Sequence, residues 1–203
     1  MPNYEYENAA RSQGFKTVCG VDEAGRGPLA GPVCAAAVIL PEGALIEGLD
    51  DSKKLSEKRR EELFEKIVKT ATAYSVAFAS VEEIEEHNIL GATFIAMNRA
   101  IDGLNIMPDF AIIDGNKIPV GIKVAAEAVV KGDGKSMSVA AASILAKVSR
   151  DRLMYEYDEK YPNYGFAKHK GYGTKLHTEM ILKYGPTECH RMSFLRKLYE
   201  KNG

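Results

Sequence analysis

The sequence predicts an α/β fold in which a mixed β-sheet is flanked by α-helices and followed by a helical C-terminal extension. Strand-like apolar runs come first and in succession, they then alternate with helical patterns, and helical patterns dominate after residue 138. The chain has 203 residues, 45% of them hydrophobic, so it can bury a sizeable core. Because no stretch has the composition of a linker, we expect one unit over residues 1–203, with roughly residues 160–203 as the extension.

The expected strands are β-prone apolar runs that end at glycine, proline or an acidic residue. The first run breaks at the segment EAGRGPLAGP, and Pro41 and Gly43 end the second. The predicted strands cover residues 17–22, 33–40, 73–80, 110–114 and 124–130.

Helices are expected before, between and after these strands. The first fifteen or so residues should form a helix or an arm. Ser56 is a candidate N-cap for a helix that ends near residue 71, where apolar residues recur on one face at helical spacing. Another helix is predicted over residues 90–101, and Ser138 is a candidate cap for a long helix that extends toward residue 161. A loop at 164–174 and two shorter helices complete the prediction.

Composition excludes several classes of protein. The cysteines, Cys19, Cys34 and Cys189, are few, odd in number and lack metal-ligand spacing, which argues against a disulfide framework and a zinc finger. Cys19 and Cys34 lie in predicted strands and are expected in the core. The polar, acidic N-terminus is unlike a secretory signal, and no apolar run could span a bilayer. We therefore expect a cytoplasmic protein with no membrane partner.

Charge is distributed unevenly along the chain. Residues 1–130 carry 13 basic and 20 acidic residues, a net charge of −7, whereas residues 131–203 carry 14 and 8, a net charge of +6. A basic C-terminal part is a hint of nucleic-acid binding. Chance clustering of solvated charges is an equally open interpretation at this point.

Four carboxylates follow predicted strands. Asp22 and Glu23 come after one apolar run, Asp114 after another, and Asp133 after a third. Ligands commonly bind at strand ends in open sheets, and clustered carboxylates repel each other unless a cation intervenes. An all-oxygen set suits Mg²⁺ or Mn²⁺, and two ions ~3.5–4 Å apart can activate water and stabilise the leaving oxygen in phosphodiester hydrolysis. The alternative for any one of these acids is a turn former or helix cap.

Two further groups of residues could bind a nucleic acid. The glycines of Gly25-Arg26-Gly27 allow close backbone approach to a ligand, and arginine can reach phosphate, although the pattern is neither a P-loop nor a dinucleotide fingerprint. Lys53 precedes a helix start, and Ser143 and Lys147 share one helix face. A plain strand-to-strand loop, solvated lysines and a surface ion pair between Lys147 and Asp151 are the alternatives.

The segment from residue 164 to 174 interleaves aromatic residues with lysine and glycine, and Tyr172 lies within it. Such interleaving suits stacking and backbone tracking on nucleic acid, whereas an ordered loop that packs its own tyrosines is the alternative. For His169, His177 and His190 a structural, hydrogen-bonding role is preferred over phosphate contact. His87 is expected at the surface or at a helix end.

Together these segments closely resemble one family, ribonuclease HII, the type 2 ribonuclease H. The matching segments follow the family order and cover nearly the whole chain, and the length and acidic N-terminus resemble bacterial members. They are GVDEAGRGPLAGPV (20–33), DSKKLS (51–56), IIDGN (112–116), VVKGD (129–133), SVAAASILAKVSRDR (138–152), YGFAKHKGYGT (164–174) and HRMSF (190–194).

The resemblance implies a ribonuclease H-like fold and endonucleolytic cleavage of RNA in RNA–DNA hybrids. It also implies cleavage 5′ of single ribonucleotides in duplex DNA, leaving 3′-hydroxyl and 5′-phosphate ends through two divalent ions. The implied catalytic and metal residues are Asp22, Glu23, Asp114 and Asp133, and the implied substrate contacts are Gly25, Arg26, Gly27, Lys53, Ser143, Lys147 and Tyr172. In the family, the glycine–arginine–glycine backbone and the tyrosine read the ribose 2′-hydroxyl at the RNA-to-DNA junction. No sliding-clamp tail is evident in LRKLYEKNG, and we expect a monomer.

Two other functions stay open from the sequence. One is a hybrid-binding module without catalysis, against which the intact acidic set argues. The other is a related nuclease with a different substrate, such as a four-way DNA junction. Cleavage assays with these substrates would separate the three.

Overall fold

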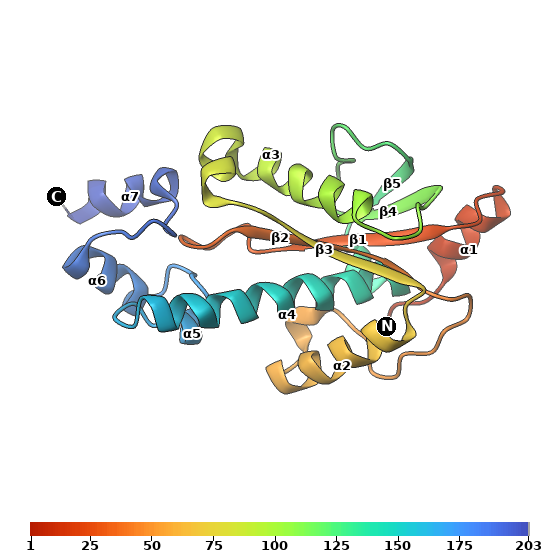
Figure 1. Cartoon of the computed structure of the whole chain (residues 1–203), viewed down its shortest axis with the longest axis horizontal. Coiled ribbons are helices and arrows are strands. Elements are labelled where there is room, and N and C mark those ends of the chain that lie inside the picture. Colours follow the sequence, from red (N-terminus) through yellow and green to blue (C-terminus); the bar gives the residue numbers. More distant parts are fainter. Residues whose placement is uncertain (203) are drawn as a thin grey trace.

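The computed structural model describes the backbone of residues 1–202 and the side chains of residues 1–200. Its centre is a five-stranded mixed sheet with the strand order β3-β2-β1-β4-β5 (Figure 1). β1 pairs antiparallel with β2 and parallel with β4, β2 pairs antiparallel with β3, and β4 pairs parallel with β5. The strands are β1 (Val18–Ala24), β2 (Val33–Ile39), β3 (Ala73–Ala79), β4 (Phe110–Asp114) and β5 (Ala125–Val129). The predicted mixed sheet is confirmed.

Helices cover both faces of the sheet, with α3 on one face and α4 on the other, as Figure 1 shows. The long helix α4 passes under β1 and β2, and α2 packs against it. The helices are α1 (Glu5–Ser12), α2 (Glu57–Thr70), α3 (Val81–Asp102), α4 (Met137–Lys160), α5 (Phe166–His169), α6 (Lys175–Tyr184) and α7 (Met192–Asn202).

Alternating residues of the central strands divide the apolar core into two layers. In β2, Ala35 and Ala37 pack in the layer shared with α3, whereas Cys34 and Ala36 pack in the layer shared with α4. This alternation is the period-2 pattern of a strand that is buried on both faces. All seven residues of β2 are buried, which explains why its sequence is a continuous apolar run rather than an alternating one.

Helix α4 approaches β1 unusually closely at Gly20. A Cβ atom at this position would lie 2.2 Å from the backbone of both Ser138 and Val139. Only glycine fits such a contact. The close approach brings the first half of α4, which carries Ser143, beside the strand that carries Asp22.

Two helix starts differ from the prediction. The cap of α4 is Ser136 rather than Ser138, because the Ser136 side chain accepts from Val139 N–H while the Ser138 hydroxyl donates to the buried Glu7. Helix α3 starts at residue 81, nine residues earlier than predicted, with Ser80 as its cap. A kink at Asn88, where φ is 57°, separates the early turns from the predicted part.

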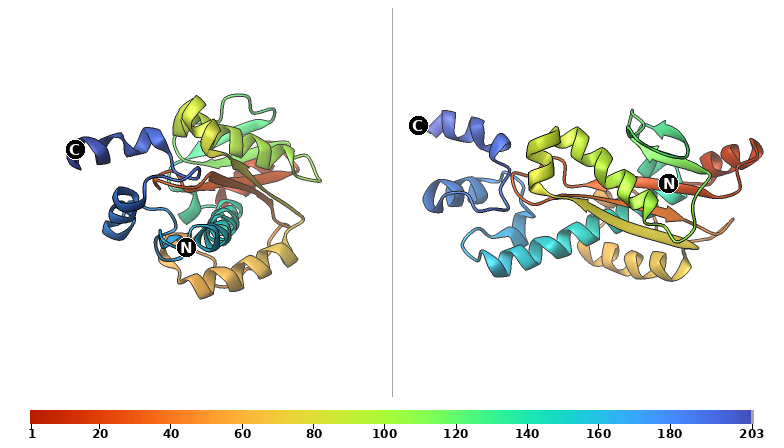
Figure 2. Two further views of the ribbon diagram at one scale, coloured as in Figure 1. Left: turned by 60° about the vertical axis from the view of Figure 1, so that its left-hand side comes forward. Right: turned by 45° about the horizontal axis from the view of Figure 1, so that its top comes forward.

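The C-terminal helices gather at one end of the molecule, beyond the ends of the strands (Figure 2). Their side chains Phe166, Ile181 and Leu195 pack in a small apolar cluster together with Ala30 and with Met154 of α4. The predicted loop at 164–174 contains the short helix α5. Among the described residues, no helix combines the length and apolar character needed to cross a membrane. The sequence predicted no clamp-binding tail in residues 195–203, and the end of that segment lies outside the described residues.

Candidate active site

Parallel pairing of β1 with β4 brings two of the predicted carboxylates together. Val21 pairs with Ile113, so Asp22 and Asp114 are the next residues at the same end of neighbouring strands. Asp22 is buried, and its carboxylate accepts a hydrogen bond from Glu23 N–H at 2.7 Å; the Ser143 side chain beside it lowers its pKa. The strand-end argument from the sequence therefore places these two acids correctly.

Glu23 joins them to form the carboxylate cluster, which we define as Asp22, Glu23 and Asp114. One carboxylate oxygen from each residue lies within 4.8 Å of the others. The guanidinium of Arg26 borders the cluster with an ion pair to Glu23 at 3.1 Å. Three carboxylates at this spacing are a donor set that suits a hard divalent cation.

Asp133 lies next to the carboxylate cluster but outside it. It belongs to a 3₁₀ turn, Gly132–Gly134, directly after β5, and its side chain is buried. The same turn holds Asp114, because Gly132 N–H donates to its Oδ1 at 2.6 Å. Lys53 Nζ forms an ion pair with Asp133 Oδ2 at 3.5 Å. The Lys53 side chain is 80% exposed to solvent.

The electrostatics of the carboxylate cluster favour a cation. Burial raises the pKa of Asp22 well above its usual value, and the neighbouring Glu23 and Asp114 raise it further. Burial also raises the pKa of Glu23, against the hydrogen bond from Arg26, and burial and Asp133 raise that of Asp114. A divalent ion among these oxygens would offset the desolvation and the mutual repulsion. The residues present therefore fit the divalent ion that the sequence implied.

A cleft of about 190 Å³ contains the carboxylate cluster and the predicted substrate contacts together. Every site residue predicted from the sequence lines it except Asp133, which adjoins it through Lys53. Its lining is Asp22, Glu23, Ala24, Gly25, Arg26, Gly27, Ser52, Lys53, Asp114, Ser143, Lys147 and Tyr172.

The glycine loop, Gly25 to Gly27, forms one wall of this cleft. Gly25 has a φ of +94°, and a Cβ atom there would lie 2.0 Å from Arg150 Nε, so only glycine fits. At Gly27 a Cβ atom would make an ordinary 3.6 Å contact with the Tyr172 ring. Gly27 and Tyr172 are thus neighbours in the lining of the cleft, and Tyr172 is 45% exposed and able to touch a ligand.

Helix α4 supplies the other wall through Ser143 and Lys147. The Ser143 hydroxyl hydrogen-bonds to that of Ser52 at 2.8 Å, a buried contact that the sequence did not suggest. Lys147 Nζ donates to Asp151 Oδ1 at 2.7 Å. The predicted alternative of an ion pair with Asp151 is therefore present, although it is largely buried rather than on the surface, and Lys147 also lines the cleft.

Three buried histidines lie behind Tyr172; His177 and His190 are hydrogen-bonded to each other, and His169 stacks on His177. His177 Nδ1 lies 2.9 Å from the Tyr172 carbonyl oxygen, and His177 Nε2 lies 3.1 Å from His190 Nε2. His190 Nδ1 accepts from Thr187 N–H at 2.9 Å, and His169 contacts the Tyr164 carbonyl oxygen. The preferred structural role of these residues is confirmed by their burial. His87 lies at the kink of α3 and is partly exposed.

Two buried arginines near the glycine loop were missed by sequence reasoning. Arg150 donates to the carbonyl oxygens of Ala30, Pro32 and Lys170, and Arg191 donates to that of Pro32 and to three others. Both lie inside matched segments, in SRDR and HRMSF, but their partners are more than 100 residues away for most contacts. No local pattern could have revealed these partners.

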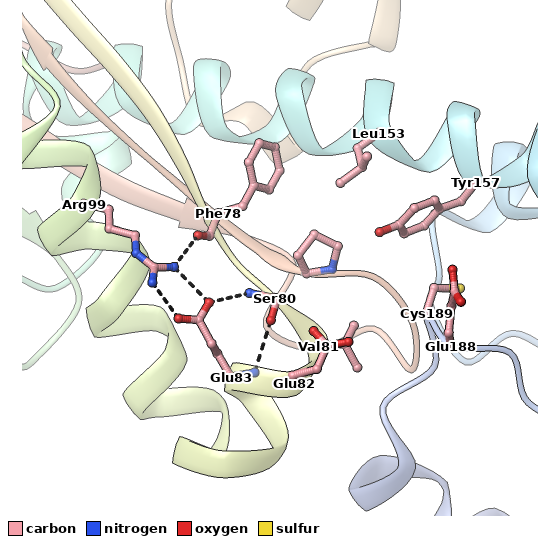
Figure 3. Close-up of a pocket in the computed structure, with 11 residues that line it drawn as sticks. Phe78, Ser80, Val81, Glu82, Glu83, Arg99, Leu153, Tyr157, Glu188 and Cys189 are labelled. Carbon is pink, nitrogen blue, oxygen red and sulfur yellow. Dashed lines mark hydrogen bonds and ion pairs between the residues drawn. The ribbon is translucent and has the colours of Figure 1, made fainter.

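A larger cavity of about 480 Å³ lies elsewhere, between the start of α3 and the C-terminal extension (Figure 3). Three of its polar residues, Ser80, Glu83 and Arg99, are hydrogen-bonded to each other. Arg99 forms a two-pronged ion pair with Glu83 at 2.6 and 2.8 Å, and Glu83 completes a capping box with Ser80. This arrangement fixes the start of α3 and contains none of the carboxylate cluster.

Comparison with known proteins identifies the class of fold and then the family. The chain superposes on the crystal structure of ribonuclease H2 from Pyrococcus horikoshii OT3 with a TM-score of 0.73 and 28% identity, covering 92% of this chain and 98% of that one. It also superposes on the ribonuclease HII of Archaeoglobus fulgidus, solved in complex with PCNA, with a TM-score of 0.69 and 31% identity over 87% and 94% of the two chains. The fold is therefore that of the ribonuclease H-like class.

The sequence match is more specific. Residues 19–197 match the Ribonuclease HII family. A ribonuclease HII of Caldicellulosiruptor bescii is 55% identical over 195 residues, which cover 96% of this chain and 94% of that protein. The chain belongs to the ribonuclease HII family, and its activity is that of a divalent-metal-dependent endonuclease that acts on RNA–DNA hybrids.

Proposed function

We propose that this enzyme cuts on the 5′ side of single ribonucleotides embedded in duplex DNA, as well as in longer hybrids, and leaves 3′-hydroxyl and 5′-phosphate ends. The observation that carries the proposal is the shared cleft. The glycine loop and Tyr172, which are suited to reading a ribose, line the same cleft as the carboxylate cluster.

The carboxylate cluster and Asp133 would hold two Mg²⁺ or Mn²⁺ ions. When bound, such ions supply an activated water and stabilise the leaving 3′-oxygen in phosphodiester hydrolysis. Asp22 is held for this purpose by the Glu23 amide, and Asp114 by the Gly132 amide. These fixed hydrogen bonds keep the carboxylates in place before substrate arrives.

The glycine loop would recognise the 2′-hydroxyl. This hydroxyl is both a donor and an acceptor, and it distinguishes RNA from DNA. Glycines 25 and 27 allow backbone N–H and C=O groups to approach it without a Cβ atom in the way. Tyr172, opposite Gly27, would stack on the neighbouring deoxyribose and disfavour a ribose there, which would select the junction.

Lys53, Ser143 and Lys147 would contact successive phosphates. The Lys53 ammonium is mostly exposed near Asp133, whereas Ser143 and Lys147 emerge from one face of α4 into the cleft. Contacts of this kind position a duplex without reading its sequence. The net charge of +6 over residues 131–203 supports duplex binding by the same mechanism.

The test uses three end-labelled duplexes of one sequence that differ at a single sugar, which is ribose, deoxyribose or 2′-O-methylribose. We expect one cut, on the 5′ side of the ribose, and no cut in the other two duplexes. Equal cutting of the ribose and deoxyribose duplexes would contradict 2′-hydroxyl recognition. Cutting that requires a run of ribonucleotides would remove the proposed junction role of Tyr172.

A further inference from the structure

The two halves of the proposed reading site come from distant parts of the chain, residues 25–27 and residue 172. Two consecutive residues of the C-terminal extension connect to these halves. Arg191 contacts the glycine loop directly, and His190 reaches Tyr172 through His177.

Arg191 holds the glycine loop through its backbone. Its guanidinium is fully buried and donates to the carbonyl oxygens of Gly25 at 2.6 Å and Arg26 at 3.0 Å. It also donates to the carbonyl oxygens of Gly31 at 2.8 Å and Pro32 at 3.2 Å, just before β2 begins. One planar guanidinium therefore joins both ends of the segment that connects β1 to β2. Lysine cannot reproduce this geometry.

His190 holds Tyr172 through His177. Thr187 N–H donates to His190 Nδ1, which leaves the proton of neutral His190 on Nε2. That proton is donated to His177 Nε2 at 3.1 Å, so the His177 proton lies on Nδ1 and is donated to the Tyr172 carbonyl oxygen at 2.9 Å. The hydrogen-bond partners thus fix both tautomers, and the chain of donors ends at Tyr172.

Backbone pairing locks the two supports to each other. Residues 29–31 lie between the segments that carry Tyr172 and Arg191: Leu29 N–H donates to Gly171, Gly31 N–H to the Cys189 carbonyl, and Arg191 N–H back to Leu29. A Cβ atom on Gly171 would lie 2.6 Å from the Ala30 carbonyl oxygen, so the segments are in close contact.

We propose that His190 and Arg191 are positioning residues that set the glycine loop and Tyr172 at the spacing needed to recognise a ribonucleotide junction. The inference rests on the proposed function of the glycine loop and Tyr172. Neither residue contacts substrate in this proposal. Misplacement of reacting groups by about 1 Å can cost about 100-fold in rate, so loss of either support should be visible in catalysis.

The test is a double-mutant cycle on kcat/KM for the single-ribonucleotide duplex, with Arg191→Met combined with Gly27→Ala. If Arg191 acts through the loop, Arg191→Met should lower kcat/KM by about 10–100-fold in the parent and by less than about 3-fold once Gly27→Ala has already impaired the loop. Leu195→Ala, which removes a fully buried apolar side chain from the same extension, is the control and should lower it by the same factor in both backgrounds.

Equal losses for Arg191→Met in both backgrounds, or a loss no greater than that of Leu195→Ala at matched thermal stability, would overturn the inference. If Arg191→Met does not fold, Arg191→Lys gives the same comparison, because it keeps the charge but not the planar fork.

A second cycle, His190→Leu with Tyr172→Ala, tests the support of Tyr172. We expect the losses in kcat/KM to be non-additive, and additive losses would contradict the role of His190. If the wild type cuts only continuous hybrids, the proposed function fails, and the same cycles on a hybrid still test positioning.

Discussion

At the residue scale, the structure places like charges together at a cost to stability. Asp22 is buried between Glu23 and Asp114. Arg26 forms an ion pair with Glu23 of the cluster, whereas Lys53 forms its ion pair with Asp133, outside the cluster. Such an arrangement stabilises a bound cation at the expense of the metal-free fold. Function and stability should therefore respond in opposite directions when one of these carboxylates is neutralised.

Asp22→Asn tests this opposition. Cleavage should fall by at least about 1000-fold because a cation ligand is lost, while hybrid binding in the presence of metal stays within about threefold. In chelator the variant should melt a few degrees above the wild type, because one repulsive charge has been removed. Thermal melting with and without Mg²⁺ and a binding titration measure both. Retained cleavage, or a lower melting temperature in chelator, would contradict this account of the cluster.

Gly25 and Gly27 should respond differently to alanine although they belong to one loop. Gly25→Ala meets both a positive φ and the Arg150 side chain, so it should lower stability by about 1–3 kcal/mol. Gly27→Ala has room against Tyr172 and should keep the stability of the wild type within about 0.5 kcal/mol, yet lower cleavage at a single ribonucleotide. Urea unfolding and kinetics on the same preparations make the comparison. Similar losses of stability in the two variants would count against it.

At the scale of elements, the start of α4 depends on a residue that lies far away in the sequence. Glu7 of α1 is fully buried, and its Oε1 accepts from the Ser136 hydroxyl, the Ser138 amide and the Ser138 hydroxyl. A carboxylate at a helix N-terminus is also favoured by the helix dipole. Helix α1 therefore fixes the helix that carries Ser143 and Lys147.

Replacing the two serines separately measures their roles. Ser136→Ala removes both the cap of α4 and a donor to Glu7, and should cost about 1–2 kcal/mol. Ser138→Ala removes one of three donors to the same oxygen and should cost less, about 0.5–1 kcal/mol. Chemical unfolding of the two variants gives the order. A larger loss of stability in Ser138→Ala than in Ser136→Ala would instead identify Ser138 as the cap of α4.

The elements also show what the sequence could and could not predict. The strands that carry Asp22 and Asp114 were predictable, because apolar runs of strand length end at each acid and parallel strand ends meet at one edge. The cap of α4 was not, since Ser136 and Ser138 are equally good caps by type. Both hydroxyls donate to Glu7 in the structure, and Ser136 is the one that also accepts from Val139 N–H. Asp133 was placed correctly after β5, but its turn sets it beside the cluster rather than within it.

At the scale of the whole molecule, the extension joins the sheet through polar contacts in a buried environment. Arg150 and Arg191 donate to backbone carbonyl oxygens there, and burial lowers the pKa of Arg191 to about 9. Most of these contacts join residues more than 100 positions apart, so the sequence motifs indicated the segments but not their contacts. His177 and His190 lie in the same contact region between the extension and the sheet.

The contact region between the extension and the sheet should make the free energy of unfolding depend on pH. Burial is the largest cause that lowers the pKa of His177 and of His190, each to about 4. Neighbouring groups make smaller contributions, some of which raise and some of which lower these pKa values. Between pH 6.5 and 4 the unfolded chain binds protons that the folded histidines do not, so stability is present above pH 6.5 and is lost as pH falls. The loss approaches about 1.4 kcal/mol per pH unit for each histidine.

Urea unfolding at pH 7, 6 and 5 tests this dependence. The wild type should lose stability steadily over the range, and the double variant His177→Gln with His190→Gln should lose much less, because glutamine does not titrate. The variant will start from a lower stability, so the slopes are compared rather than the values. Equal slopes would show that other groups are responsible.

The central claim is that the carboxylate cluster and the glycine loop act on one phosphodiester bond, at a ribonucleotide. The most direct measurement is cleavage of an end-labelled DNA duplex with one ribonucleotide, in Mg²⁺, in Mn²⁺ and in chelator. We predict a single cut on the 5′ side of that ribonucleotide with either metal and none in chelator. Cutting that persists in chelator, or binding without any cutting in either metal, would contradict the claim.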